Sequence, residues 1–296
     1  MLHQHTPAAS GDELDLDGHG LTQLDESPLA GHALRKISLY DNQLTALPVA
    51  LFRHRNLRVL NISCNQLDRL PPEIGQLQQL EMFDFGHNRA NELPEELGQL
   101  HRLKYLYLSD NGFSDLPRSL AQLQQLVYLN ATDNHLTVLP QAIPRLAALQ
   151  ELRLYNNRIG NLPAEIGQLH ALRELHIMKN ALTSLPAEMA QLGELEILDA
   201  ANNAIAELPQ AFCRLPRLSE LSLRFNQLTR LPDNIGELTA LRSLDLRANR
   251  LSDLPESLGE LSRLRKLDLR WNDFTRTPKV VDILRARGCR LRPGRR

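Results

Sequence analysis

One series of positions in the sequence brings together side chains that could do chemistry. At intervals of 23 residues the chain carries a carboxylate, a thiol, an imidazole and two further carboxylates: Asp41, Cys64, His87, Asp110 and Asp133. A cysteine beside a histidine can form an activated nucleophile, and the same side-chain types are ligands of metal ions such as Zn²⁺. The series is therefore a candidate for a catalytic or metal-binding column.

A second group of ionisable residues follows the same spacing. Glu151 and Glu174 are 23 residues apart, His176 comes two residues later, and Arg153 accompanies them. If successive coils place each group on an open surface, no pocket excludes water and no oxyanion hole is formed. We therefore interpret both groups as solvated or partner-recognising side chains, and we predict neither an enzyme, nor a metal site, nor a cofactor.

The element that must position these residues is a repeat. The pattern L-x-x-L-x-L-x-x-N-x-L-x-x-L-P-x-x-I-x-x-L-x-x recurs every 23 residues without insertion from 34 to 286. The ninth position is always asparagine: Asn42, Asn65, Asn88, Asn111, Asn134, Asn157, Asn180, Asn203, Asn226, Asn249 and Asn272. The fifteenth is always proline, from Pro48 to Pro278. We predict eleven repeats of one structural unit.

Each recurring residue has a mechanical reason. The alternating leucines at positions four and six predict a short strand with one buried face, and stacked coils pair such strands in parallel about 4.8 Å apart. An asparagine amide can satisfy backbone groups left unpaired where the chain turns, so we expect a hydrogen-bonded asparagine ladder inside the core. Proline at position fifteen fixes φ before a short helical turn on the other side of the coil.

These residues resemble the leucine-rich repeat family, in particular the 23-residue Leu-Pro type of Ras-group intracellular and bacterial proteins. The resemblance implies an α/β solenoid, a curved right-handed superhelix with a parallel sheet on its concave face and short helical turns on its convex face. Residues 11–33 keep the leucines but replace asparagine with His19 and proline with Asp25, which predicts a degenerate N-terminal cap. The last repeat should form a C-terminal cap helix over 279–287.

The segments outside the repeats are short. We expect residues 1–10 to be disordered and 287–296 to form a basic tail after the cap helix. Its arginines could contact nucleic acid or an anionic membrane, but the segment has no interleaved aromatic residue. We expect neither partner.

In a solenoid of this kind, positions three, five, seven and eight of each repeat lie on a sheet face that the core does not cover. All five tyrosines of the chain and its one tryptophan fall at these positions. An exposed aromatic patch is typical of an interaction hot spot, although tyrosines also stabilise strands by stacking. We expect the partner-binding residues of the first half to be Val59, Met82, Tyr105, Tyr107, Tyr128 and Tyr155.

Towards the C-terminus the same face carries arginines and aromatic rings: Arg224, Phe225, Arg247, Arg270 and Trp271. Asp245 and Asp268 alternate with the arginines. This pattern is consistent with a self-neutralising Arg–Asp ladder and equally with a groove for an acidic partner segment.

Composition limits the class of protein. A net charge of −1 argues against bulk attraction to polyanions. An odd number of cysteines, three, favours a reducing compartment, and the N-terminus resembles no secretory signal. We therefore expect a cytoplasmic monomer, and leave open secretion as an effector without a signal peptide.

The function that these features favour is a scaffold or adaptor that binds a protein partner on its concave face, with no small-molecule substrate. The alternative is the recognition part of a bacterial effector or signalling enzyme, of ubiquitin ligase or kinase type, whose catalytic domain lies elsewhere.

Overall fold

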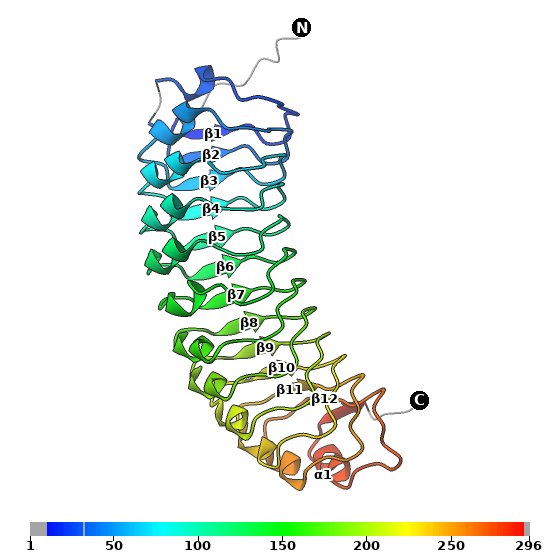
Figure 1. The fold of residues 1–296 in the computed structure, drawn as a ribbon. Helices are drawn as coiled ribbons and strands as arrows, with labels where there is room; N and C mark the ends of the chain where they lie inside the picture. The colour runs from blue at the N-terminus through cyan, green and yellow to red at the C-terminus, as the bar shows by residue number, and fades with distance from the viewer. Residues whose placement is uncertain (1–10, 32, 293–296) are drawn as a thin grey trace. The chain divides into compact units, whose positions relative to one another are not determined.

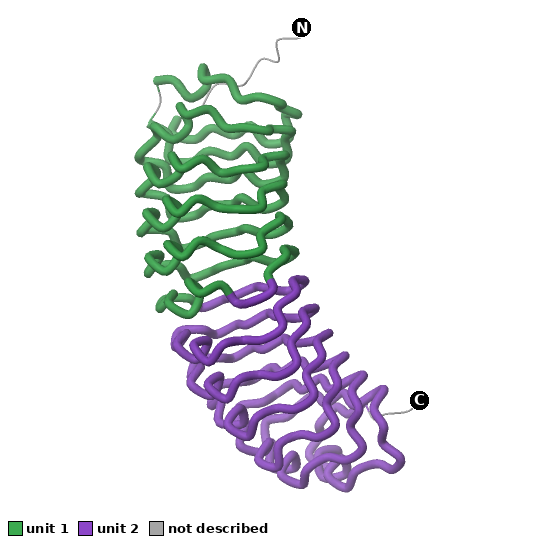
Figure 2. The backbone as a smooth tube through the Cα atoms, in the orientation of Figure 1, with its two compact units in different colours: residues 1–136, 140–149 green, residues 137–139, 150–296 purple. Residues whose placement is uncertain are grey.

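The computed structural model describes residues 11–31 and 33–292. The chain divides into two compact units (Figure 2). Unit 1 comprises residues 1–136 and 140–149, and unit 2 comprises residues 137–139 and 150–296. The segment 1–10, for which disorder was predicted, lies outside the described residues.

Each coil contributes one three-residue strand, and the strands follow one another in chain order (Figure 1). In unit 1 the strands are β1 Glu13–Asp15, β2 Lys36–Ser38, β3 Val59–Asn61, β4 Met82–Asp84, β5 Tyr105–Tyr107 and β6 Tyr128–Asn130. In unit 2 they are β7 Glu151–Arg153, β8 Glu174–His176, β9 Ile197–Asp199, β10 Glu220–Ser222, β11 Ser243–Asp245, β12 Lys266–Asp268 and β13 Arg290–Arg292.

The pairing within each unit is parallel and keeps the repeat register. Tyr105 pairs with Tyr128 in unit 1, and Ser243 pairs with Lys266 in unit 2. Because every strand covers positions three to five, position four points into the core while positions three and five remain accessible in most coils. At position five, Ser38 and Asp268 are buried. An unbroken 23-residue period thus places equivalent side chains in columns across the sheet.

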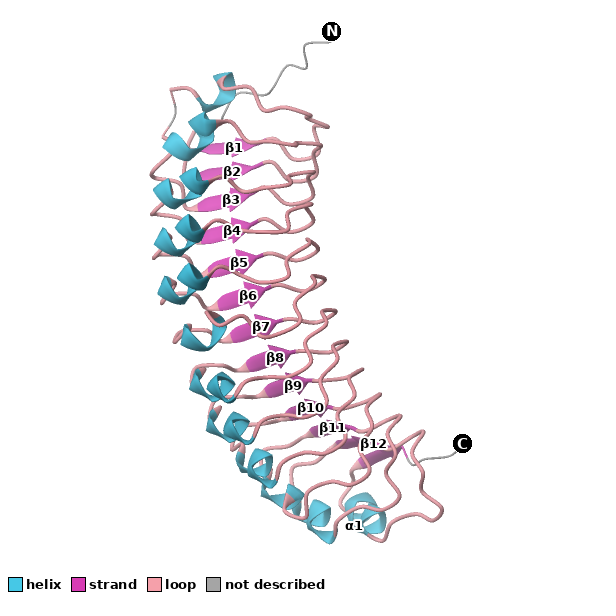
Figure 3. Ribbon diagram, in the orientation of Figure 1, coloured by secondary structure: helices cyan, strands magenta, loops and turns pink. Residues whose placement is uncertain are grey.

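Short 3-10 helices lie across each coil from the strands (Figure 3). They are η1 Ser27–Leu29, η2 Val49–Arg53, η3 Pro72–Gln76, η4 Glu95–Gln99, η5 Arg118–Gln122, η6 Ile143–Arg145, η7 Ala164–Gln168, η8 Ala187–Gln191, η9 Gln210–Arg214, η10 Ile235–Glu237 and η11 Glu256–Glu260. Most begin directly after the repeat proline, as η5 does after Pro117. Neighbouring helices pack closely: a Cβ at Gly98 would lie 2.4 Å from the carbonyl oxygen of Ser119.

The core is a stack of leucines joined by asparagine amides. Asn134 is 4% exposed. Its Nδ2 donates to the carbonyls of Thr132 at 2.9 Å and Leu108 at 3.0 Å, and its Oδ1 accepts from the amide of Phe113 at 3.1 Å. The same bonds to the preceding coil are made by Asn42, Asn65, Asn88, Asn111, Asn180, Asn203, Asn226, Asn249 and Asn272. Asn157 donates to the carbonyl of Leu154.

The residue before each asparagine adopts a left-handed backbone conformation. This position eight has φ between 51° and 60° at Asp41, Cys64, His87, Asp110, Asp133, Asn156, Lys179, Asn202, Phe225, Ala248 and Trp271. Aspartate, asparagine and histidine tolerate this region better than other side chains, whereas other non-glycine residues pay about 1–2 kcal/mol. The sharp turn off the strand therefore explains the frequent aspartate and asparagine at this position.

Both ends of the array are covered by irregular elements. The degenerate first coil supplies β1 and η1, and β1 pairs with β2. At the other end the helix α1 Val280–Ala286 packs on η11. Part of the predicted tail 287–296 differs from expectation, because Arg290–Arg292 form β13 and extend the sheet from β12. The outer edge of β12 is therefore paired with β13. Along the described chain, helices are too short and too polar for any of them to cross a membrane.

Candidate functional site

The accessible side of each unit's sheet, formed by positions three, five, seven and eight, is called the open face here. Its strands alternate in burial, as β5 does with Tyr105 exposed, Leu106 buried and Tyr107 half-buried. The open face of each unit carries a distinct set of side chains, and these sets are the candidate sites.

Unit 1 carries the tyrosine patch, defined as Val59, Met82, Tyr105, Tyr107 and Tyr128. Strand register aligns its position-three residues in one column from Val59 to Tyr128. Tyr105 is 43% exposed, and the other members are half-buried. The rings of Tyr107 and Tyr128 lie 4.9 Å apart at 39°, a tilted arrangement that aromatic pairs favour. The patch combines stacked rings with an accessible apolar surface.

A carboxylate that sequence reasoning did not single out lies beside this patch. Asp84 is paired in register with Tyr107 and accepts a hydrogen bond from the amide of Gly86 at 2.9 Å. Burial raises the pKa of Asp84, while the hydrogen bonds from Gly86 and Ser63 partly oppose that rise. The tyrosine patch therefore has a half-buried acid at its edge, with no basic partner at salt-bridge distance among the described residues.

In the column that contains Cys64 and His87, these two side chains do not form a catalytic pair. Tyr40 and Asp41 lie close enough to the Cys64 thiol to affect its pKa, whereas Nδ1 of His87 lies 2.9 Å from a carboxylate oxygen of Asp110. Burial raises the pKa of the Cys64 thiol, and burial also raises the pKa of Cys213, to about 12. Neither thiol is activated by its surroundings, because a nucleophilic cysteine requires a lowered pKa.

Unit 2 carries the arginine–aromatic patch, defined as Arg224, Phe225, Arg247, Arg270 and Trp271. Phe225 is 43% exposed and Trp271 is 53% exposed. Their ring centroids are 6.2 Å apart, and the Arg270 guanidinium lies 5.4 Å from the centre of the Trp271 ring. That distance is within the range of a cation–π interaction.

Two of these arginines are held by aspartates. Arg247 donates from Nε and Nη2 to Asp245 at 2.9 Å and 2.6 Å. Arg270 donates from Nε and Nη2 to Asp268 at 2.9 Å and 2.7 Å, and Arg247 lies 3.5 Å from the same carboxylate. Burial acts to raise the pKa of Asp268, but the hydrogen bonds and charge of Arg270 outweigh it and lower that pKa. The Arg–Asp ladder, one of the two interpretations that the sequence allowed, is therefore present in this structure.

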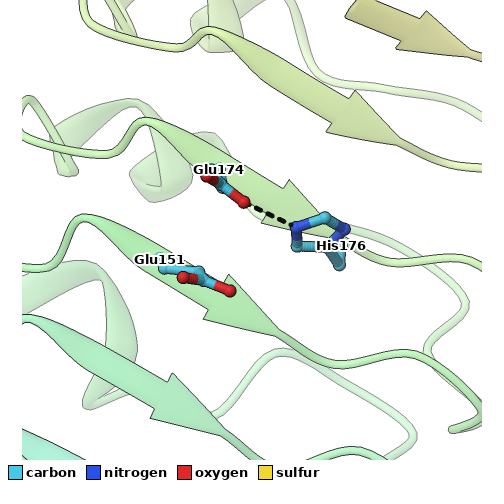
Figure 4. A group of neighbouring side chains, drawn as sticks. All are labelled: Glu151, Glu174 and His176. Atoms are coloured by element: carbon cyan, nitrogen blue, oxygen red, sulfur yellow. Dashed lines mark hydrogen bonds and ion pairs between the residues drawn. The ribbon is translucent and has the colours of Figure 1, made fainter.

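The acid–histidine cluster lies on β7 and β8 of unit 2 (Figure 4). One ligand atom from each of Glu151, Glu174 and His176 lies within 4.8 Å of the others. Nε2 of His176 is 3.1 Å from Glu174, and Nε of Arg153 donates to Glu151 at 2.5 Å. Each carboxylate thus has a cationic or hydrogen-bonding partner within the chain. Tyr155, the remaining predicted binding residue, is half-buried on the same unit.

Sequence reasoning missed the left-handed turn and the unequal pairing of the three arginines. The left-handed turn had a signal in the sequence, since five of the eleven position-eight residues are aspartate or asparagine. The unequal pairing of the arginines also had a signal in the sequence. Position five is Asp245 and Asp268 in two coils but Ser222 in the coil of Arg224. The edge position of Asp84 had no comparable signal, because burial depends on its neighbours' side chains.

Comparison with known proteins places this geometry in a family. A family model described as a leucine-rich repeat region matches residues 83–180 and 160–286, and a single leucine-rich repeat model matches residues 56–77. No curated protein sequence is significantly similar to the chain.

Among solved structures, a leucine-rich repeat protein of Leptospira interrogans is 34% identical with a TM-score of 0.90, over 95% of this chain and 72% of that one. The structure of a TDR receptor is 29% identical with a TM-score of 0.75, over 88% of this chain and 48% of that one. An internalin, InlF, of Listeria monocytogenes is 22% identical with a TM-score of 0.71, over 96% and 86%. The repeat models and these structures agree with the coil geometry, and the chain belongs to the leucine-rich repeat family.

Proposed function

We propose that this chain is a non-catalytic scaffold or adaptor that binds a protein partner on its open face. The leucine-rich repeat fold is suited to protein–protein interaction, and its variable positions lie on the face that the core leaves accessible. The observation that carries the proposal is the exposure of large apolar side chains there: Tyr105, Phe225 and Trp271 are each more than 40% exposed, at 43%, 43% and 53%. Exposed aromatic residues of this kind dominate the binding energy of many interfaces.

A binding role is more consistent with the site than catalysis. The thiol of Cys64 has a raised pKa, and the carboxylates of the acid–histidine cluster are occupied by neighbouring side chains. Both groups lie at open-face positions of their units. The geometry thus favours recognition of a surface over transformation of a small molecule.

The proposal is tested by replacing Tyr105 and Tyr128 with alanine and comparing captured proteins by quantitative mass spectrometry. The matched control replaces Val49 and Val138, which are 54% and 58% exposed and lie outside the strands. We expect the tyrosine variant to lose its specific partner while the valine variant retains it, with both variants folded by circular dichroism. Equal capture by wild type, the tyrosine variant and a Phe225→Ala/Trp271→Ala variant would refute binding through the open face.

A further inference from the structure

The three stacked arginines of unit 2 are not equivalent. Arg224, Arg247 and Arg270 occupy the same position of successive coils, as the amide of Phe225 donating to the carbonyl of Arg247 shows. Arg247 and Arg270 are each held by a carboxylate two residues earlier in the chain. In the coil of Arg224 the corresponding residue is Ser222, and no described carboxylate lies within salt-bridge distance of the Arg224 guanidinium.

The side chain of Arg224 is also incompletely hydrogen-bonded. Its Nε is buried and has no hydrogen-bond partner in the described part of the chain. A buried donor without a partner is unfavourable, and a guanidinium offers five donors in a planar fork that matches a carboxylate. The residue beside it on the preceding coil is the buried Ala201, which supplies no acceptor side chain. Arg224 is thus a cation for which the described residues provide no counter-ion.

An aromatic surface adjoins this cation. Phe225 and Trp271 lie two coils apart with Ala248 between them, and their rings are 6.2 Å apart. Both residues have positive φ, 55° and 60°, where bulky side chains are disfavoured. Large rings retained at a strained and exposed position are better explained by contact with a partner than by stability.

From this arrangement we infer that the arginine–aromatic patch binds an acidic peptide segment of a partner protein. A carboxylate of the segment pairs with Arg224, and a neighbouring apolar side chain packs on Phe225 and Trp271. This inference rests on the proposed function and adds the chemistry of the partner.

The charge of the surrounding face supports an acidic partner. Lys266 and, on β13, Arg290 and Arg292 add positive charge, whereas Asp245 and Asp268 are already engaged by arginines. Of the remaining acids on the open face of unit 2, Glu151 and Glu174 are bonded to Arg153 and His176, and Asp199 accepts a hydrogen bond from the amide of Ala201. Glu220 lies on β10 at the opposite end of the strand from Arg224. A basic segment would find these carboxylates engaged, with the exposed Glu220 as the exception. An acidic segment would find Arg224 available.

The test uses the full chain as bait for a phage-displayed library of random linear dodecapeptides. We expect the selected peptides to be enriched in aspartate or glutamate next to an apolar residue. A selected peptide is then synthesised with a fluorophore, alongside its Glu→Gln or Asp→Asn counterpart, and binding is measured by fluorescence anisotropy. The protein variants are Arg224→Gln, Arg224→Lys and a charge-matched control, Arg230→Gln, whose side chain is 80% exposed and lies outside the open face.

We expect Arg224→Gln to weaken binding about tenfold or more, as for loss of a charge-assisted bidentate contact. Arg224→Lys keeps the charge without the planar fork and should lie in between. Arg230→Gln should bind like wild type. The amide-substituted peptide should bind to wild type as weakly as the acidic peptide binds to Arg224→Gln. Binding of the amide-substituted peptide to Arg224→Gln should be only slightly weaker still.

Other results would overturn the inference. If peptides lose binding in a Phe225→Asn/Trp271→Asn variant but show no acidic preference, the open face binds peptides and only the proposed partner chemistry fails. If no selected peptide depends on Phe225 and Trp271, the patch is not the site. If peptide binding also survives loss of Tyr105 and Tyr128 together with both patch rings, the proposed function fails as well. An Arg224→Gln variant that binds the acidic peptide as wild type does would equally refute the pairing.

Discussion

The open faces of the two units share the same backbone geometry, but different interactions stabilise their side chains. In unit 1 the rings of Tyr107 and Tyr128 stack 4.9 Å apart without any charge. In unit 2 the open face carries Arg247 and Arg270, which are bound to Asp245 and the buried Asp268. The difference teaches that one repeat register accommodates either an apolar or an ionic surface, because the leucine and asparagine framework beneath does not depend on it.

The two surfaces should nevertheless respond differently to mutation. Dispersion and burial hold the tyrosine patch, and these forces are little affected by salt or pH. The arginine–aromatic patch depends on a carboxylate that is 2% exposed and therefore contributes to the fold as well as to the surface.

The largest effect should be common to both units. Replacing Asn134 in unit 1 or Asn249 in unit 2 with alanine leaves several buried backbone groups unpaired. We expect each to reduce the free energy of unfolding by about 3 kcal/mol, because each buried unpaired group costs about 1–3 kcal/mol. Urea titration followed by circular dichroism measures this, and unequal losses would show that the shared framework is not equally important in both units.

A second effect should be confined to unit 2. Asp268→Asn removes the charge that two arginines share, and we expect a loss of about 2 kcal/mol, below the 3–5 kcal/mol of a fully buried pair. Asp282→Asn, whose side chain is 72% exposed, is the control and should change stability by less than about 0.5 kcal/mol. Equal urea midpoints for the two variants would indicate that the ladder does not stabilise the fold.

The pH dependence should have opposite signs in the two units. The pKa of Asp268 is lowered in the folded state, so its stabilisation is present above the unfolded pKa of about 3.9 and is lost as pH falls through the folded value. The pKa of Asp84 is raised, so its protonated form favours folding below about 3.9 and this contribution disappears as pH rises through the folded value. Thermal unfolding between pH 3 and 6, with Asp84→Asn and Asp268→Asn, should remove these two dependences separately.

A smaller effect concerns the stacked tyrosines. A double-mutant cycle with Tyr107→Leu and Tyr128→Leu should give a coupling energy of about 0.5–1.5 kcal/mol, unchanged by added salt. The comparable cycle for Asp245 and Arg247 should weaken as salt is raised. Tyrosine coupling that is sensitive to salt would contradict the apolar character assigned to unit 1.

The smallest effect is a gain. Phe225→Asn or Trp271→Asn places a residue that tolerates positive φ at a strained turn, and we expect stability to rise by up to about 1 kcal/mol. Asp133→Asn in unit 1 is the control and should leave stability nearly unchanged. Destabilisation by Phe225→Asn would mean that the ring is retained for packing and would weaken the argument for partner contact.

The sequence was sufficient to predict the parts of the structure that depend on periodicity. Leucine spacing predicted the parallel coils, and Pro117 and its equivalents predicted the helical turns that follow them. It could not predict that residues 290–292 pair with β12, since the arginines there carry no strand pattern.

The accessible residues of the site were also predictable, because the register assigns each position to a face. The hydrogen bonds and ion pairs between these side chains were less predictable. Whether His87 bonds to Asp110 or to Cys64 depends on side-chain rotamers and backbone angles at a left-handed turn. A period in the sequence defines neighbours, but the bonds between them depend on local geometry.

The asparagine amides have a consequence for how such a surface could change over time. Within each unit, an amide reaches only its own coil and the one before it, as Asn226 does with Leu223 and Ala200. Duplicating or deleting a whole 23-residue coil would therefore disturb only the junctions, since every other amide keeps its partners. Gene segments that encode single coils could thus be copied or exchanged to lengthen the recognition surface, with the remaining core still able to fold.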